Sequence, residues 1–195
     1  MAKTFFERIK SFIISPKKAF EAEHKTSTKE AIIYGLKGFL VLAIPYSLIF
    51  GVITALAGSP IGFFIIPALF LLMWLGGFLG LLVASLWYHV WAYVFGAKQG
   101  LGNTVKALFF GSTPTYVLGW IPIVNFAVGI WSIVLFGLGL TKLQKLSTAR
   151  AVGAILTAVL IPVILIIAVL VGIFLIFGPA IFASNQTTST FSVPY

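Results

Sequence analysis

Residues 38–97 read GFLVLAIPYSLIFGVITALAGSPIGFFIIPALFLLMWLGGFLGLLVASLWYHVWAYVFGA and contain no Asp, Glu, Lys or Arg. A helix that crosses a bilayer needs about 20 predominantly apolar residues. These sixty residues are therefore long enough for two crossings, and the turn sequence Gly58-Ser59-Pro60 divides them. Two further uncharged runs, 107–141 and 151–195, predict two crossings and one crossing respectively.

The composition of the whole chain agrees with this interpretation. Sixty per cent of the 195 residues are hydrophobic and nine per cent are charged, whereas a soluble domain carries about 25% charged residues. A soluble fold of this composition would expose apolar surface to water on every side. The predicted fold class is therefore all-α: a polytopic membrane protein with five transmembrane helices, preceded by an N-terminal amphipathic helix.

Turn and charge signals divide the chain into three parts. We expect a cytoplasmic amphipathic segment over 1–30, a five-helix transmembrane domain over 31–178 and an external polar tail over 179–195. The five predicted crossings are 31–57, 62–96, 103–120, 123–141 and 150–178. The second would be about 52 Å long as one straight helix. It must therefore tilt, kink near Gly76-Gly77-Gly80 or run partly along the membrane surface.

The first helix is predicted over residues 4–14, TFFERIKSFII, where apolar and polar positions separate at helical spacing. Phe5, Ile9 and Phe12 lie on the apolar face. Such a helix lies in the headgroup plane of a membrane, or it packs against the cytoplasmic side of its own protein. The sequence leaves both alternatives open.

The cations indicate the orientation. Eight Lys and Arg residues lie within 1–37, and the others are Lys98, Lys106, Lys142, Lys145 and Arg150. With five crossings and a cytoplasmic N-terminus, all thirteen fall on the cytoplasmic side, as the positive-inside rule requires. The C-terminus is then external or lumenal. We attribute the net charge of +9 to attraction for anionic lipid headgroups, and we expect no nucleic-acid partner.

The residue types that carry catalysis are scarce. The chain has no Cys and no Asp, and its four Glu residues all lie in the first thirty positions. A hydrolytic triad lacks its acid, metal ligands are not clustered, and a proton-coupled pump lacks carboxylates inside the membrane. We therefore expect neither an enzyme nor a cofactor. A passive pore or a lipid-handling protein stays open, and Asn185-Gln186-Thr187 would permit glycosylation of the tail.

One group of residues is a candidate site for a lipid or a partner protein: His89, Lys98, Lys106, Pro114 and Tyr116. The glycine-rich connection from Gly96 to Gly102 can turn backbone N–H groups toward an anion, with the two lysines supplying charge. Pro114 frees a backbone carbonyl one turn earlier, which a neighbouring hydroxyl can satisfy. In the alternative interpretation the glycines form only a turn and the lysines only set topology.

The middle of the chain resembles the Yip1-domain family. The similarity rests on His89, Gly96-Ala97-Lys98-Gln99-Gly100, Thr104, Lys106, Pro114, Ile121-Pro122, Trp131, Gly139-Leu140, Leu146-Ser147 and Arg150-Ala151. Phe5, Ile9, Pro16 and Phe20 resemble prokaryotic members in particular. Each motif is weak alone, but their order and spacing extend over residues 4–175.

This resemblance implies five transmembrane helices, a cytoplasmic N-terminus and an external or lumenal C-terminus. A prokaryotic protein would lie in the plasma membrane, and a eukaryotic one in Golgi or ER membranes. Eukaryotic relatives bind one another and associate with Rab-type small GTPases. This chain lacks their long N-terminal region and the Asp-Leu-Tyr-Gly-Pro motif, which puts a GTPase partner in doubt.

The resulting hypothesis is a non-catalytic membrane protein that organises the bilayer or binds partner proteins. Its expected partners are anionic lipid headgroups on the cytoplasmic side, other membrane proteins and further copies of itself. The alternative, from a different class, is a small channel, transporter or lipid-translocating protein. A solid helix bundle favours the first hypothesis, and a polar passage or a lipid-sized groove favours the second.

Overall fold

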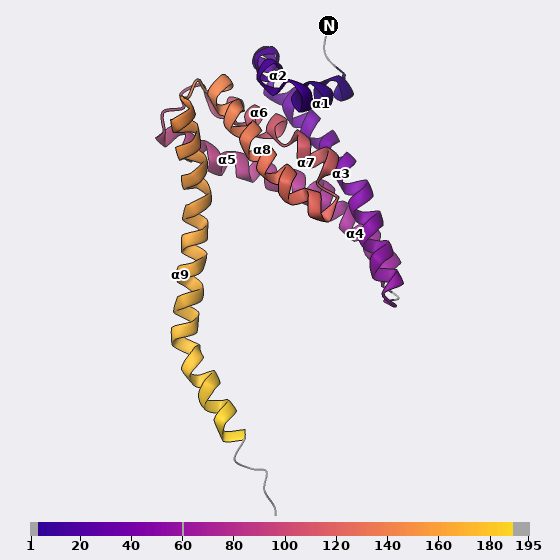
Figure 1. Ribbon diagram of the computed structural model, residues 1–195, viewed down its shortest axis with the longest axis vertical. Coiled ribbons are helices and arrows are strands. Elements are labelled where there is room, and N and C mark those ends of the chain that lie inside the picture. The colour runs from indigo at the N-terminus through magenta and orange to yellow at the C-terminus, as the bar shows by residue number, and fades with distance from the viewer. Residues whose placement is uncertain (1–3, 60, 189–195) are drawn as a thin grey trace, which may run out of the picture. The chain divides into compact units, whose positions relative to one another are not determined.

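The computed structural model describes residues 4–59 and 61–188, with side chains as far as Phe177, and all the regular structure in them is helical (Figure 1). The elements are α1 (Phe5–Ile14), α2 (Pro16–Ala22), the 3₁₀ turn η1 (Glu23–Lys25), α3 (Thr28–Leu56), α4 (Gly62–Leu71), the π-helical turn η2 (Leu72–Gly76), α5 (Gly77–Val94), α6 (Leu101–Gly111), α7 (Thr113–Leu118), α8 (Pro122–Leu143) and α9 (Thr148–Thr188). The chain divides into two compact units, and the boundary between them falls after Ile155. The second consists of the remainder of α9.

In the described part of the chain, four helical stretches are long and apolar enough to cross a membrane: Thr28–Leu56, Gly62–Val94, Pro122–Leu143 and Thr148–Phe177. This confirms the all-α membrane class. The third predicted crossing, 103–120, is divided between α6 and α7, so neither helix reaches membrane-spanning length alone. The α-helix of the last crossing extends to Thr188, ten residues beyond its predicted end. Residues 189–195 of the predicted tail and the side chain of Asn185 lie outside the described residues.

The break between α6 and α7 follows from Pro114. Proline has no N–H, so the carbonyl of Phe110, four residues earlier, loses its helical partner. The Thr113 hydroxyl donates to that carbonyl over 2.6 Å, which confirms the expected satisfaction by a side chain. Because the single Thr113 hydroxyl hydrogen is used in this bond, the Tyr34 hydroxyl on α3 is the donor in its 2.8 Å contact with Thr113 Oγ1.

The second apolar stretch, Gly62–Val94, departs from α-helical geometry near the glycines at which a kink was predicted. The π-helical turn η2 ends at Gly76, and α5 begins at Gly77. Trp74, within η2, donates its indole N–H to the Leu36 carbonyl over 3.2 Å. A Cβ at Gly77 would lie 2.6 Å from the ring of Phe39. The π turn therefore lies against α3, and Gly77, which has no side chain, permits this close approach.

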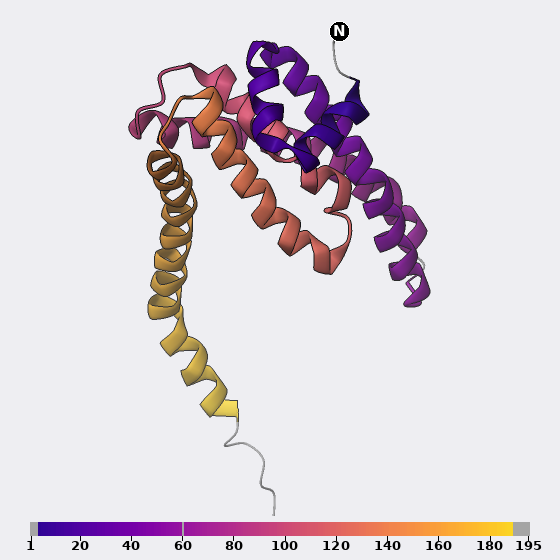
Figure 2. The same cartoon turned by 45° about the horizontal axis from the view of Figure 1, so that its top comes forward.

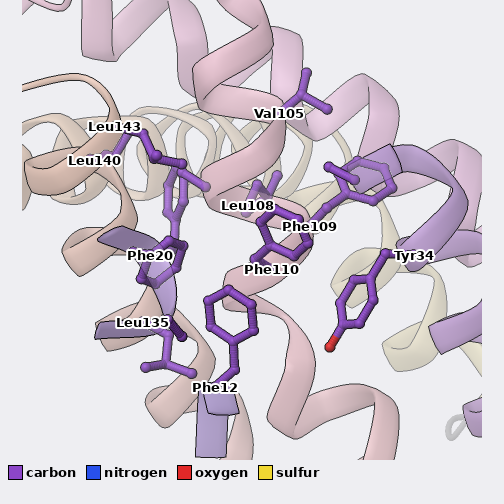
Figure 3. Close-up of a cluster of buried hydrophobic side chains, with 14 of the residues drawn as sticks. Phe12, Phe20, Tyr34, Val105, Leu108, Phe109, Phe110, Leu135, Leu140 and Leu143 are labelled. Atoms are coloured by element: carbon purple, nitrogen blue, oxygen red, sulfur yellow. The ribbon is translucent and has the colours of Figure 1, made fainter. Parts of the chain in front are cut away.

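Helix α6 runs through the core of the first unit, and all its residues from Thr104 to Gly111 are buried. Aromatic side chains of other helices surround it, among them Phe12, Phe20 and Tyr34 (Figure 3). Phe12 stacks on Phe110 with ring centroids 5.1 Å apart, and Tyr34 lies 5.2 Å from the same ring. Offset and edge-on aromatic contacts add specific geometry to the apolar burial. The first unit is thus a filled helix bundle around α6.

Helix α1 packs on this bundle through the face that its sequence predicted. Thr4 and Glu7 form a capping box at its start. Phe12 is fully buried in the core, and Phe5 and Ile9 pack against it. These contacts belong to the second alternative, a helix docked on its own protein. Phe6, 75% exposed, points away from the core.

The outer surface is strongly apolar. Large exposed hydrophobic side chains cover one side of the 62–94 stretch and the C-terminal half of α3, and on the second unit they surround α9. Soluble monomers rarely expose contiguous apolar patches of this extent. Together with the helix lengths, this surface makes the chain an integral membrane protein.

The close approach of α3 to α6 yields a stability prediction. A Cβ at Gly35 would overlap the buried ring of Phe109, whereas a Cβ at Gly80 meets nothing within 4 Å. Gly35→Ala should destabilise the protein by about 1–3 kcal/mol, because overpacking forces the ring to shift. Gly80→Ala should leave stability unchanged or slightly raised, since alanine favours helix. Melting in detergent, followed by tryptophan fluorescence, measures both. Equal melting temperatures for the two variants would contradict the packing described here.

Candidate functional site

Helix ends and connecting segments on one side of the first unit meet at what we call the basic end: residues 5–37, the loop 95–100 and the segment 144–150. The Lys106 ammonium donates to the carbonyls of His24 and Thr26, both over 3.1 Å. The Gln144 amide donates to the Gly100 carbonyl over 2.7 Å. The α3–α4 and α7–α8 turns lie at the opposite end of the unit (Figures 1 and 2).

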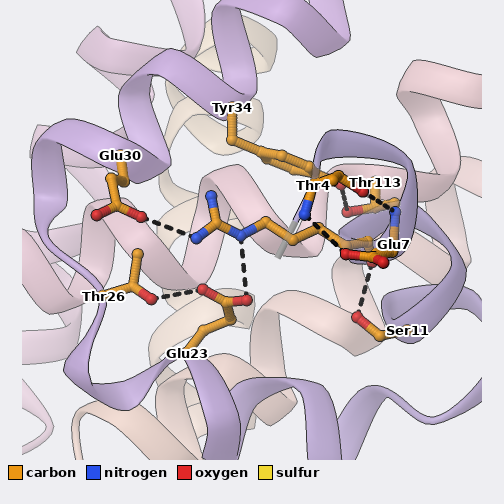
Figure 4. Close-up of polar contacts among 9 residues, drawn as sticks. Thr4, Glu7, Ser11, Glu23, Thr26, Glu30, Tyr34 and Thr113 are labelled. Carbon is orange, nitrogen blue, oxygen red and sulfur yellow. Dashed lines mark hydrogen bonds and ion pairs between the residues drawn. The ribbon is translucent and has the colours of Figure 1, made fainter. Parts of the chain in front are cut away.

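A partly buried ion-pair cluster fixes the N-terminal helices there (Figure 4). Arg8 Nε donates to Glu23 over 3.1 Å, and Arg8 Nη2 donates to Glu30 over 2.8 Å. Thr26 donates to the second Glu23 oxygen over 2.5 Å. Burial lowers the pKa of Arg8, but the bonds and charges of the two carboxylates outweigh it and the pKa is raised. The cluster joins α1 to η1 and α3 through the guanidinium group of Arg8, which stays protonated.

The remaining carboxylates also have partners within the chain. Glu21 on α2 accepts from Lys142 on α8 over 2.5 Å, and that hydrogen bond and charge lower the pKa of Glu21. This pair is exposed, so it contributes little to stability. Glu7 accepts from the Thr4 backbone N–H over 2.8 Å. All four glutamates are therefore engaged inside the protein.

Most of the cations, by contrast, have no carboxylate partner. Nine are exposed and form no ion pair with any described residue: Lys10, Lys17, Lys18, Lys25, Lys29, Lys37, Lys98, Lys145 and Arg150. They lie on α1, α2, η1, the first turns of α3 and α9, and the two connecting segments of the basic end. Arg150 reaches the other loop, with a guanidinium nitrogen 3.3 Å from where a Cβ of Gly96 would be. This surface can therefore attract anions.

Of the predicted site residues, His89 does lie beside the glycine-rich loop. Its Nδ1 is 2.8 Å from the Thr104 hydroxyl on α6, which also accepts from the Gln144 amide over 2.8 Å. The Gln144 oxygen accepts from the Gln99 N–H over 3.0 Å. Thr104 and Gln144 are buried. A polar network thus links α5, α6 and the end of α8 beneath the loop.

The other predicted residues lie apart from that network. Lys106 is buried, and its ammonium is directed to the two carbonyls near η1. Tyr116 is fully buried in the aromatic core, 5.2 Å from Phe39, and Pro114 is buried beside it in α7. Lys98 is exposed on the loop. The structure therefore brings His89 to the loop but directs Lys106, Pro114 and Tyr116 into the interior.

Sequence reasoning missed Gln144 and Arg8. Gln144 lies in a segment predicted only as a separator of helices, and Arg8 appeared only as part of a polar helix face. The available signal was the presence of only four glutamates beside thirteen cations. Each carboxylate that becomes buried needs a cationic partner, so ion pairs within the chain could have been predicted.

The basic end offers cation-lined surface hollows in which an anionic group can bind. The described residues contain no group of three or more His, Cys, Asp or Glu side chains that could hold a metal. Surface hollows of about 210, 330 and 370 Å³ lie on the first unit. Those of 210 and 330 Å³ are lined by cations of the basic end, Arg8 with Lys37 and Lys17 with Lys18 respectively. The third is lined almost wholly by apolar side chains.

The buried position of Lys106 can be tested by substitution. Lys106→Met removes the donor to the carbonyls of His24 and Thr26, and a hydrogen bond to a charged group contributes about 1.5–3 kcal/mol. We expect a lower melting temperature and faster tryptic cleavage after Lys17 and Lys18. Lys98→Met, which removes an equal charge from the exposed loop, should change neither. Equal cleavage rates in the two variants would show that Lys106 does not hold the N-terminal helices.

Comparison with known proteins identifies one relationship. A family model described as the Yip1 domain matches residues 10–173. This range contains every element from α2 to α8 in full, the second half of α1 and most of α9. Searches of curated proteins and of solved structures give no significant match.

Proposed function

The chain belongs to the Yip1-domain family, and we propose that it is a non-catalytic membrane protein that organises anionic lipids through its basic end. The same surface can accept an acidic segment of a partner membrane protein. Membrane location and helical architecture are established above. Lipid organisation is the proposal, and it rests on the distribution of charge.

One observation carries it: every glutamate is engaged within the chain, while nine exposed cations in the described residues are not. Their positive charge is therefore available to anionic groups outside the chain. A Lys or Arg near an anionic membrane surface is attracted by about 1 kcal/mol. Several such Lys and Arg residues on one rigid surface favour a cluster of anionic lipids around the protein.

The rigidity of the scaffold favours an organiser over a transporter. The centre of the first unit holds buried aromatic side chains around α6. Two buried hydroxyls pair across helices, those of Tyr34 on α3 and Thr113 on α7, over 2.8 Å. A water-filled path would need polar groups left available to solvent. A platform with a solid core fits a binding role.

We further propose five crossings, with α6 and α7 together forming the third. These helices start at the basic end, where Gly100 contacts Gln144, and end at the turn where α8 begins its return. Residues 101–118 extend for about 27 Å, close to the thickness of a hydrocarbon core. In this proposal the basic end faces the cytoplasm, and the exposure of Phe6 and Ile14 supports a position of α1 at the headgroup level.

Single-cysteine labelling tests this topology, because the chain has no native cysteine. An impermeant thiol reagent applied to intact cells should label Ser59→Cys and Asn125→Cys. Lys98→Cys should react only after permeabilisation. If Lys98→Cys and Asn125→Cys react on the same side, α6 and α7 do not cross the membrane.

Reconstitution separates the two functional hypotheses. Vesicles that contain the full-length protein and phosphatidylglycerol should show local enrichment of a labelled anionic lipid at the protein, measured by energy transfer from its tryptophans. High salt should reduce this enrichment. Ion leakage and lipid exchange between leaflets should match those of empty vesicles. Protein-dependent flux without enrichment would instead support a channel or lipid-translocating protein.

A further inference from the structure

Resting on this proposed function, we propose that the hollow between α2 and α8 binds one anionic phospholipid, with its phosphate at Lys17 and Lys18 and one acyl chain along α8. The hollow measures about 330 Å³ and is lined by Ser15, Pro16, Lys17, Lys18 and Leu138. Its wall is almost wholly apolar, and two of the residues that form it are lysines, each of which carries a cationic end. That combination matches the boundary between headgroup and acyl chain.

The sequence creates this hollow by interrupting the N-terminal helix. Ser15 has non-helical backbone angles (φ −141°, ψ 63°), and Pro16 starts α2 immediately afterwards. The change of direction places the opposite face of α2 on α8. Ala19 and Phe20 are buried there, and a Cβ at Gly139 would lie 2.9 Å from the Phe20 ring. Burial of that face leaves the two lysines outside, beside the break.

The charges around the hollow require an external anion. Glu21, one turn from Lys17 and Lys18 on α2, already accepts from Lys142. Glu23, at the end of α2, is buried against Arg8. Neither lysine has an ion pair with a described residue. The Ser15 hydroxyl makes no capping bond to α2 and offers a neutral donor at the same place.

The apolar part of the site continues along α8. Leu138 lines the hollow, and Val134 and Trp131 precede it by four and seven residues on the same helical face. Val134 and Trp131 are 56% and 43% exposed. They lead away from the lysines for about 10 Å, which is half or more of an extended acyl chain. A free phosphate gains nothing from this stripe, so the occupant is a membrane lipid.

Native mass spectrometry of the full-length protein in mild detergent tests the charged half of the site. Wild-type protein should bind phosphatidylglycerol more tightly than phosphatidylcholine. The double variant Lys17→Gln/Lys18→Gln should weaken phosphatidylglycerol binding by roughly tenfold or more. The matched variant Lys10→Gln/Lys25→Gln removes the same charge from α1 and η1, outside the hollow, and should weaken phosphatidylglycerol binding much less.

A second pair of variants tests the apolar half without changing charge. Leu138→Trp fills the hollow and should release the retained lipid. Ile133→Trp adds the same side chain at an exposed position on a different face of α8 and should not. Melting temperatures confirm that each variant is folded.

The outcomes separate the site from the general function. If both lysine double variants weaken binding equally, or if Leu138→Trp keeps the lipid, this site is wrong while the basic end still binds anionic lipid. If wild-type protein shows no preference for phosphatidylglycerol over phosphatidylcholine, the proposed function fails together with the site.

Discussion

The close approach of neighbouring backbones to α6 is the constraint on which the first unit depends. A Cβ at Gly111 would lie 2.8 Å from the backbone nitrogen of Phe136, and one at Gly139 would lie 2.8 Å from the Ala107 side chain. Gly35 admits the Phe109 ring on the α3 side. Lipid tails are as apolar as these side chains, so burial alone gives little drive for association inside a bilayer. Tight contact and a few interhelical hydrogen bonds have to provide it.

The same helix organises the polar contacts of the basic end. Thr104 and Lys106 on α6 are buried, and each bonds to segments outside the helix core: Thr104 to His89 and Gln144, and Lys106 to the carbonyls near η1. One helix therefore positions the N-terminal pair of helices and the end of α8 together. These bonds hold the backbone segments that carry the exposed lysines. The proposed selective attraction of lipid headgroups requires such fixed positions.

Most of the helical architecture could be predicted, because the forces that set it are local. Uncharged runs predicted the long helices, and Pro114 predicted the freed carbonyl at which α6 ends. The connections at the basic end could not be predicted, because they join residues far apart in sequence. Lys106 looked like a topology signal, but its ammonium is satisfied by carbonyls about 80 positions earlier. Tyr116 looked available beside a proline break, but the aromatic core encloses it.

The packing of α1 and α2 also has a consequence for biosynthesis. Phe12 and Phe20 emerge from the ribosome early, but their partners Phe110 and Gly139 lie about a hundred positions later. The first long helix, α3, is synthesised before those partners exist. During that interval the two phenylalanines lack the core that buries them in the complete bundle. Docking of the N-terminal helices on the bundle therefore has to follow the synthesis of α6 and α8.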